Sequence, residues 1–123
     1  MKIDCEQLEG DVYRISLLGR MDLPGTEEIE TDFVRMTSAP RKAILLDLSG
    51  VNFVTSFAIR TILYNAKGLH RRGGKMVLLN PDASVKKILE TAGIHTLIPI
   101  RPDLPTALAA LAEVTYADDD EDF

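Results

Sequence analysis

The chain has 123 residues, which is enough for one domain with a buried core and too few for two. Hydrophobic residues make up 46% of the sequence and charged residues 27%, a composition typical of a folded protein rather than a disordered one. The formal net charge of −5 argues against a general nucleic-acid binder held by phosphate contacts. Because Cys5 is the only cysteine, no internal disulfide is expected, and a reducing, cytoplasmic location fits best.

Two strands and a helix are predicted within the first forty residues. Apolar and polar residues alternate over 12–18, which predicts a strand, and residues 3–8 are placed to pair with it as a hairpin. Glutamates at 27, 28 and 30 and an apolar stripe at 29, 33 and 36 then predict an amphipathic helix with an acidic first turn. We expect this helix to end before Pro40.

Strands and helices are predicted to alternate through the rest of the chain. The apolar run 43–48 predicts a strand inside a sheet, ended by a turn at Ser49-Gly50. One apolar stripe from Ser56 onward predicts a helix that stops at Gly73-Gly74. Further strands are expected at 75–79 and 96–100. A helix is expected at 82–92, with a buried stripe of Val85, Ile88, Leu89 and Ala92. A last helix is expected from 103 onward, with Ala107, Leu108 and Leu111 buried. This order predicts an α/β fold with a largely parallel sheet.

The acidity of the chain is concentrated at its C-terminus, where residues 118–122 are all acidic. Residues 1–32 hold nine acidic and three basic side chains, whereas residues 57–87 hold seven basic and one acidic. This polarity predicts either steering of a charged partner or simply a solvated helix face. We expect residues 1–114 to form the domain and 115–123 to be a disordered tail, for which the basic helix is the nearest match in charge. No apolar run approaches the roughly 18 residues of a membrane span, so neither export nor membrane insertion is expected.

Few side chains offer catalytic or metal-binding chemistry. His70 and His95 are the only histidines, and neither has further ligands at metal-binding spacing, so both are expected to be ordinary surface residues. The sequence lacks a phosphate-binding glycine loop and a nucleophile elbow, and we expect no cofactor and no metal. An enzyme with Ser56 as nucleophile is disfavoured because no base lies near it in the sequence.

The most distinctive stretch is residues 47–60, in which a buried strand leads to Thr55 and Ser56 in the first turn of a helix. One hypothesis is that a hydroxyl there only caps the helix, which is worth about 1 kcal/mol. The other is that a hydroxyl is phosphorylated, because the unpaired N–H groups and the dipole of a helix N-terminus stabilise a phosphate. A phosphate adds about −1.5 to −2 charge and would release a partner docked there.

Several motifs, in their order and spacing, resemble those of the STAS domain, the module of bacterial anti-sigma factor antagonists. The resemblance covers roughly residues 2–113. The motifs are Gly19-Arg20-Met21-Asp22, Asp47-Leu48-Ser49-Gly50-Val51 with Phe53, Arg72-Gly73-Gly74, Leu78-Leu79-Asn80-Pro81, and Leu89-Glu90-Thr91-Ala92-Gly93-Ile94 followed by Leu97-Ile98-Pro99-Ile100. This resemblance implies the STAS fold, a central mostly parallel sheet with about four helices.

The same resemblance implies a regulatory binding protein that does no catalysis itself. The unphosphorylated domain would bind an anti-sigma factor that is also a serine kinase, and phosphorylation would release it, with a phosphatase and a weak homodimer as further expectations. Typical members read D-S-S-G where this chain has Thr55-Ser56-Phe57-Ala58, so Phe57 stands at the usual acceptor position, while stressosome-type relatives modify the hydroxyl that directly follows the aspartate. Ser56 is therefore the first candidate acceptor and Thr55 the second. The candidate partner contacts are Asp22, Asn52, Thr55, Ser56, Phe57 and Arg60.

A second class of function stays open beside this one. Because Thr55 and Phe57 replace the usual residues, the chain also fits a STAS scaffold or a transporter-associated regulatory subunit whose loop is read without phosphorylation.

Overall fold

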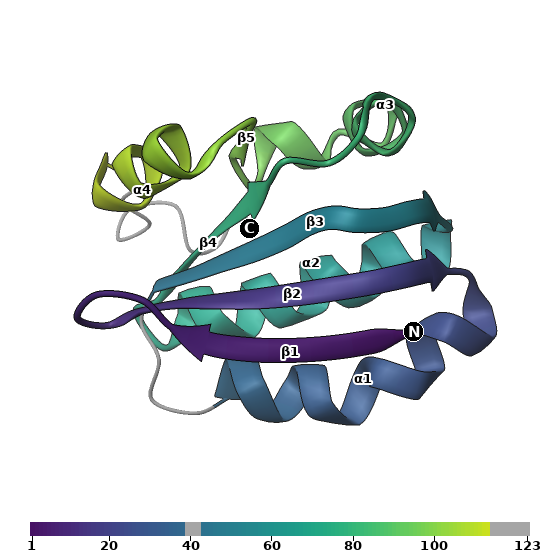
Figure 1. The fold of residues 1–123 in the computed structure, drawn as a ribbon, viewed down its shortest axis with the longest axis horizontal. Coiled ribbons are helices and arrows are strands. Elements are labelled where there is room, and N and C mark those ends of the chain that lie inside the picture. The colour runs from purple at the N-terminus through teal and green to yellow at the C-terminus, as the bar shows by residue number, and fades with distance from the viewer. Residues whose placement is uncertain (39–42, 114–123) are drawn as a thin grey trace.

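The computed structural model describes residues 1–38 and 43–113, and it confirms the predicted α/β fold (Figure 1). The predicted domain end at 114 and the tail at 115–123 lie outside the described residues. In chain order the elements are β1 (Lys2–Gln7), β2 (Val12–Met21), α1 (Leu23–Ser38), β3 (Ala43–Val54), α2 (Ser56–Arg71), β4 (Lys75–Leu79), α3 (Ala83–Thr91), the 3-10 helix η1 (Ile94–Thr96), β5 (Ile100–Arg101) and α4 (Leu104–Glu113).

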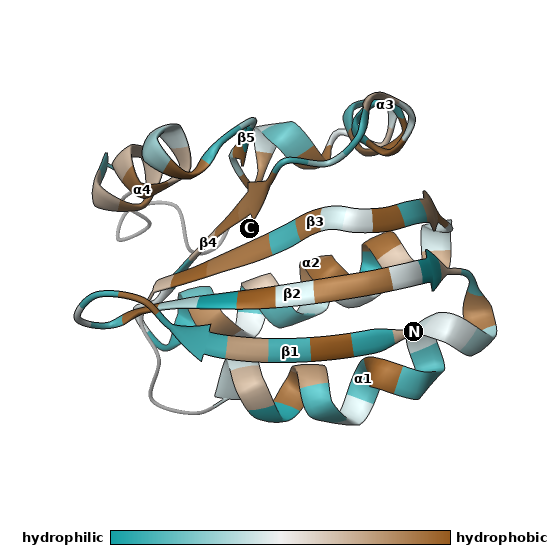
Figure 2. Cartoon of the chain, viewed as in Figure 1, coloured by the Kyte–Doolittle hydropathy of each residue, from teal (hydrophilic) through white to brown (hydrophobic). Residues whose placement is uncertain are grey.

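The strands form one five-stranded sheet in the order β1-β2-β3-β4-β5. The predicted hairpin is confirmed, because β1 pairs antiparallel with β2 and sets Ile3 opposite Leu17. All the other neighbours are parallel. Figure 2 shows hydrophobic residues concentrated in β3 and β4, as expected for strands inside a sheet that is covered by helices.

Helices cover both faces of the sheet, and each face has its own core. The larger core joins α1, α2 and α3 to residues of β2, β3 and β4, with Phe33 of α1 fully buried. The smaller core packs α4, through Ala107, Ala110 and Leu111, on the opposite face of β3 and β4. Figure 1 shows α1 and α2 side by side in the same layer, so their exposed surfaces adjoin.

The predicted turn at Ser49-Gly50 is wrong, because β3 continues to Val54. Its pairing with β2 shifts register twice, first between the pairs of Ser16 and Leu18 and again between those of Gly19 and Arg20, and each shift gives β3 one extra residue. Gly50 permits this close pairing, since a Cβ there would stand 2.9 Å from the Leu17 carbonyl oxygen. With these two bulges, β3 continues as far as Val54, which pairs with Met21 at the end of β2.

Three smaller predictions are also corrected. Because α1 already begins at Leu23, the glutamates at 27, 28 and 30 follow its first turn, which holds no acidic residue. The strand expected at 96–100 is mostly the 3-10 helix η1, and only the two residues of β5 pair with β4. Ile88 and Leu108 were expected inside, yet each is 37% exposed, and Ala92 is exposed where α3 has ended.

Candidate functional site

The candidate site lies at the edge of the sheet where the parallel strands β2 and β3 end and α1 and α2 begin. The carbonyl oxygen of Met21, the last residue of β2, accepts two hydrogen bonds from Thr55, which directly follows β3. The Thr55 backbone N–H donates at 3.1 Å and the Thr55 hydroxyl also donates at 3.1 Å. These bonds hold the two helix starts beside each other.

Asp22 caps the start of α1. Its Oδ1 accepts from the backbone N–H of Gly25 at 2.9 Å, its carbonyl oxygen accepts from the N–H of Thr26 at 2.9 Å, and its Oδ2 accepts from Arg20 Nε at 3.1 Å. The guanidinium carbon of Arg20, Cζ, in turn lies 3.8 Å from the ring centroid of Phe53, which is a cation–π contact. The structure thus gives this carboxylate a capping role, and its predicted contact with a partner stays a prediction.

Thr55 and Ser56 have different surroundings at the start of α2. The Thr55 hydroxyl accepts from the N–H of Ala58 at 3.2 Å while donating to Met21, so both its donor and an acceptor position are used in capping. Ser56 is exposed, and its hydroxyl makes no hydrogen bond within residues 1–38 and 43–113. The capping role therefore belongs to Thr55, whereas the phosphorylation hypothesis concerns the exposed hydroxyl of Ser56.

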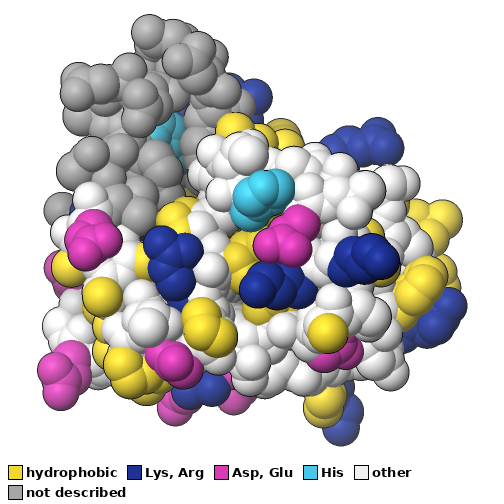
Figure 3. Space-filling model, turned by 90° about the horizontal axis from the view of Figure 1, so that it is seen from above, with side chains coloured by type: hydrophobic (Ala, Val, Ile, Leu, Met, Phe, Trp, Pro, Cys, Tyr) yellow, Lys and Arg dark blue, Asp and Glu magenta, His cyan; other side chains and the backbone are white. Residues whose placement is uncertain are grey.

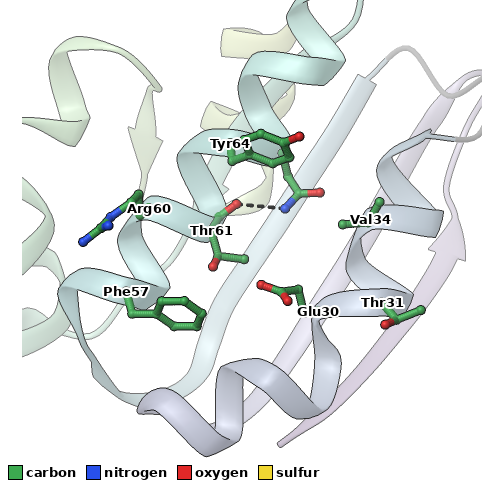
Figure 4. A pocket seen from close by; sticks show the side chains of 8 residues that line it. Glu30, Thr31, Val34, Phe57, Arg60, Thr61 and Tyr64 are labelled. Atoms are coloured by element: carbon green, nitrogen blue, oxygen red, sulfur yellow. Dashed lines mark hydrogen bonds between the residues drawn. The ribbon is translucent and has the colours of Figure 1, made fainter.

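The other predicted contacts divide between the sheet edge and α2. Asn52 is exposed and belongs to β3 rather than to a loop. Phe57 and Arg60 both line a groove between α1 and α2. Figure 4 shows the Phe57 ring turned toward the groove, whereas the Arg60 side chain points away from α1. The structure brings Asp22, Thr55 and Ser56 to one corner and leaves Phe57 and Arg60 beside it.

Sequence reasoning did not find this groove, which has a volume of about 550 Å³. Its lining residues are Glu30, Thr31, Val34, Phe57, Arg60, Thr61, Tyr64 and Asn65. Tyr64 is 72% exposed, which is high for an aromatic side chain. The sequence gives only a weak signal for this surface, namely an aromatic residue outside the apolar stripe of α2. Asn65 donates to the Thr61 carbonyl oxygen at 2.8 Å, the dashed line in Figure 4. It also accepts from the buried Thr37 hydroxyl at 2.8 Å, and this bond joins the two helices.

A second hollow of about 360 Å³ continues the groove toward the end of α2. It shares Val34, Tyr64 and Asn65 with the first hollow and adds cationic side chains. Its lining residues are Val34, Thr37, Ser38, Tyr64, Asn65, Lys67, Gly68, Arg71 and Arg72. The face seen from above in Figure 3, which carries α3 and α4, shows instead basic and acidic side chains interspersed.

Two polar side chains outside this corner are buried, and one of them was expected at the surface. His70 is 6% exposed, so the expectation of a surface residue is wrong, because the buried face of α2 is wider than its apolar stripe and includes Asn65 and His70; His95 is exposed. Asp47 of the Asp47-Leu48-Ser49-Gly50 motif is 5% exposed, and its Oδ2 accepts from Arg14 Nε at 3.0 Å and Nη2 at 2.6 Å. Burial alone would raise the pKa of Asp47, but hydrogen bonds from Ser49 and the Arg14 guanidinium hold it below the ordinary value.

Within the described residues, no helix has both the length and the apolar composition that crossing a membrane requires.

Comparisons with known proteins agree on one family. The STAS domain profile matches residues 2–107. A Bordetella bronchiseptica protein assigned as an anti-sigma factor antagonist, BtrV, is 24% identical over 110 residues, covering 89% of this chain and 94% of its own. The crystal structure of an anti-sigma factor antagonist from Mycobacterium paratuberculosis has a TM-score of 0.81 at 20% identity, with 91% of this chain and 94% of that chain covered.

The anti-sigma factor antagonist SpoIIAA has been solved in two forms that both resemble this chain. The unphosphorylated form gives a TM-score of 0.73 at 18% identity and covers 93% of this chain and 99% of that one. The phosphorylated form, from Bacillus, gives 0.65 at 18% identity and covers 88% and 97%. At these identities the likeness shows a shared fold.

Proposed function

Because the chain belongs to the STAS domain family, we propose that it acts as an anti-sigma factor antagonist that binds an anti-sigma factor around the start of α2. The observation that carries the proposal is the exposed Ser56 at the first position of α2, beside a threonine that already caps the helix. BtrV and SpoIIAA, which match nearly the whole chain, both have this function in their names. The protein regulates by binding rather than by catalysis.

The proposed binding surface surrounds the corner where the two helices start. Asn52, Ser56 and Arg60 are exposed there and offer polar contacts, and Phe57 adds an apolar edge at the groove. Asp22 and Thr55 contribute mainly by fixing the starts of α1 and α2, since their side chains are engaged in caps. A partner therefore meets an ordered surface and spends little free energy on fixing it.

The proposed switch is phosphorylation of Ser56 by a serine kinase, the anti-sigma factor itself. The hydroxyl oxygen attacks the γ-phosphorus of ATP, ADP leaves, and the hydroxyl proton passes to the kinase. Within the described residues the N–H groups of Ser56 and Phe57 make no hydrogen bond, so they are available to the new phosphate. The added charge of about −1.5 to −2 then lies within the partner surface and releases the partner, and a phosphatase restores binding.

A reconstitution with an anti-sigma factor kinase encoded in the same genome tests the proposal. The unmodified chain should bind in a calorimetric titration, and incubation with kinase and ATP should abolish binding while adding one phosphate at Ser56, located by mass spectrometry. Ser56→Ala should bind normally and lose the response to ATP. The matched control is Ser84→Ala, which removes a hydroxyl from the first turn of α3 and should leave the response intact.

Phe57 favours a second candidate function, a STAS scaffold that is read without phosphorylation. The residue at the usual acceptor position has no hydroxyl, and its half-buried ring lines the groove. In that case the chain is recovered in a stable assembly, Ser56 stays unmodified in the presence of the kinase, and Phe57→Ala weakens the assembly. Binding that survives full modification of Ser56 would favour this function over the switch.

A further inference from the structure

We propose that the acidic C-terminal segment of this chain, residues 114–123, docks on the basic part of the groove between α1 and α2. The basic part is the hollow lined by Lys67, Arg71 and Arg72 together with Tyr64. The proposal does not depend on the proposed function, because it concerns contacts within one chain.

The basic part of the groove has a uniform sign of charge. Among the described residues that line it, three are cationic and none is acidic. Arg72 is already engaged, since its Nη2 donates to the Thr37 carbonyl oxygen at 2.6 Å. Arg71 is exposed and Lys67 half-exposed, and neither forms an ion pair with a described acidic side chain. The surface is therefore open to an anionic group.

The segment follows α4, which packs on the opposite face of the sheet but ends at the same end of the sheet as α2. Lys75 Nζ donates to the carbonyl oxygen of Leu111 at 3.2 Å, so the end of α4 lies at the start of β4. The start of β4 follows Arg71 by only four residues, across the Gly73-Gly74 turn. Ten residues remain after Glu113, and an extended chain of ten residues spans about 33 Å. Arg71 and Tyr64 are about 10 Å apart along α2, which leaves about 23 Å of the extended segment to pass from Glu113 around the end of the sheet to Arg71.

The order of side chains in the segment matches the order along the groove. Residues 118–122 are five consecutive acids, and the aromatic residue Phe123 follows them. Going from the end of α2 toward its start, the groove offers Arg71 and Lys67 first and then Tyr64 and the apolar edge at Phe57. Acids placed on the cations thus bring Phe123 to the exposed Tyr64 ring. Both the charge and the apolar end of the segment gain a contact.

The chain's own segment is favoured over a second copy because it is tethered. A tether of about ten residues holds its end at an effective concentration on the order of millimolar, well above that of a free protein in solution. The contacts are at the surface, where charges are screened beyond roughly 8 Å at physiological salt. We therefore expect a docked state that is salt-sensitive and independent of protein concentration.

Amide NMR spectra of the full-length chain test the proposal. The test variant neutralises the segment through Asp118→Asn, Asp119→Asn, Asp120→Asn, Glu121→Gln and Asp122→Asn. Compared with this variant, the unaltered chain should show shifted amide signals over residues 64–72 of α2. In 1 M NaCl the amide signals of the unaltered chain should move to the positions that they have in the neutral variant. Differences confined to the segment itself would overturn the proposal.

Charge reversal on the groove supplies the matched pair. Arg71→Glu should give signals for residues 118–123 that match those of a released segment, whereas Lys87→Glu, an exposed lysine on α3, should leave them unchanged. Equal effects of the two reversals would mean that only the net charge matters, which overturns the docking site. Shifts that grow with protein concentration would place the segment on a second copy and overturn it as well.

Discussion

Replacing Asp47 by asparagine should lower the free energy of unfolding by about 2–3 kcal/mol at pH 7. The substitution keeps the shape of the side chain and the oxygen that accepts from the Ser49 N–H at 2.9 Å. It turns an amide group toward the two Arg14 nitrogens that now donate to Oδ2. Breaking a fully buried pair costs about 3–5 kcal/mol, and we reduce this because the Arg14 side chain is 31% exposed and stays partly hydrated.

The effect should depend on pH in a direction fixed by the lowered pKa of Asp47. A carboxylate whose pKa is lower in the folded state stabilises the fold above its unfolded pKa, ordinarily 3.8, and loses that contribution as the pH falls through the folded pKa. The difference between the unaltered chain and Asp47→Asn should therefore be full at neutral pH and should shrink below about pH 4.

Urea unfolding followed by circular dichroism measures the effect, with the midpoint moving and the slope unchanged. The control is Asp32→Asn, which removes an exposed helix pair with Arg35 at 2.8 Å and should cost less than about 0.5 kcal/mol. If Asp47→Asn and Asp32→Asn cost the same, or if the difference persists unchanged at pH 2, the assigned role of the buried carboxylate is wrong.

Further substitutions separate neighbouring positions. Thr55→Ala should lower the free energy of unfolding by about 1 kcal/mol or more, because it removes the cap of α2. Ser56→Ala should change this free energy by less than about 0.5 kcal/mol. Equal urea midpoints for the two variants would contradict the assignment of the cap to Thr55. Gly25→Ala should lower the free energy of unfolding by about 3 kcal/mol or more, because the new Cβ would overlap the Arg20 carbonyl oxygen. Gly68→Ala, inside α2, should raise it by about 0.5–1 kcal/mol. Thermal melts that fail to move in opposite directions would refute this.

Local patterns in the sequence predicted most elements because they depend on neighbouring residues. The alternation over 12–18 and the stripe from Ser56 onward each reflect one buried face, and both elements begin where expected, although β2 continues to Met21. The length of β3 could not be predicted in this way, because its bulges depend on pairing with β2, a strand that is distant in the sequence. Ser49-Gly50 has the composition of a turn and is held in a strand by tertiary contacts.

The site was predictable where it depends on one helix start. The sequence predicted a capping hydroxyl at Thr55 or Ser56 before an apolar stripe, and the structure gives this role to Thr55. The groove was not predictable, because it exists only where α1 and α2 pack beside each other. Asn65 shows the difficulty, since asparagine is a residue type that is mostly exposed, yet here it is buried and bonded to Thr37 of the other helix.

The double use of the Met21 carbonyl oxygen has a mechanical consequence. One oxygen receives both bonds from Thr55, so the starts of α1 and α2 are tied at a single point rather than along a broad contact. A force that lifts the first turn of α2 must break both bonds together, whereas the end of β2, which leads directly into α1, stays paired with β3 through Met21 and Val54. A displacement of Thr55 therefore acts first on a carbonyl group that the sheet holds in place, one residue before the Asp22 cap of α1.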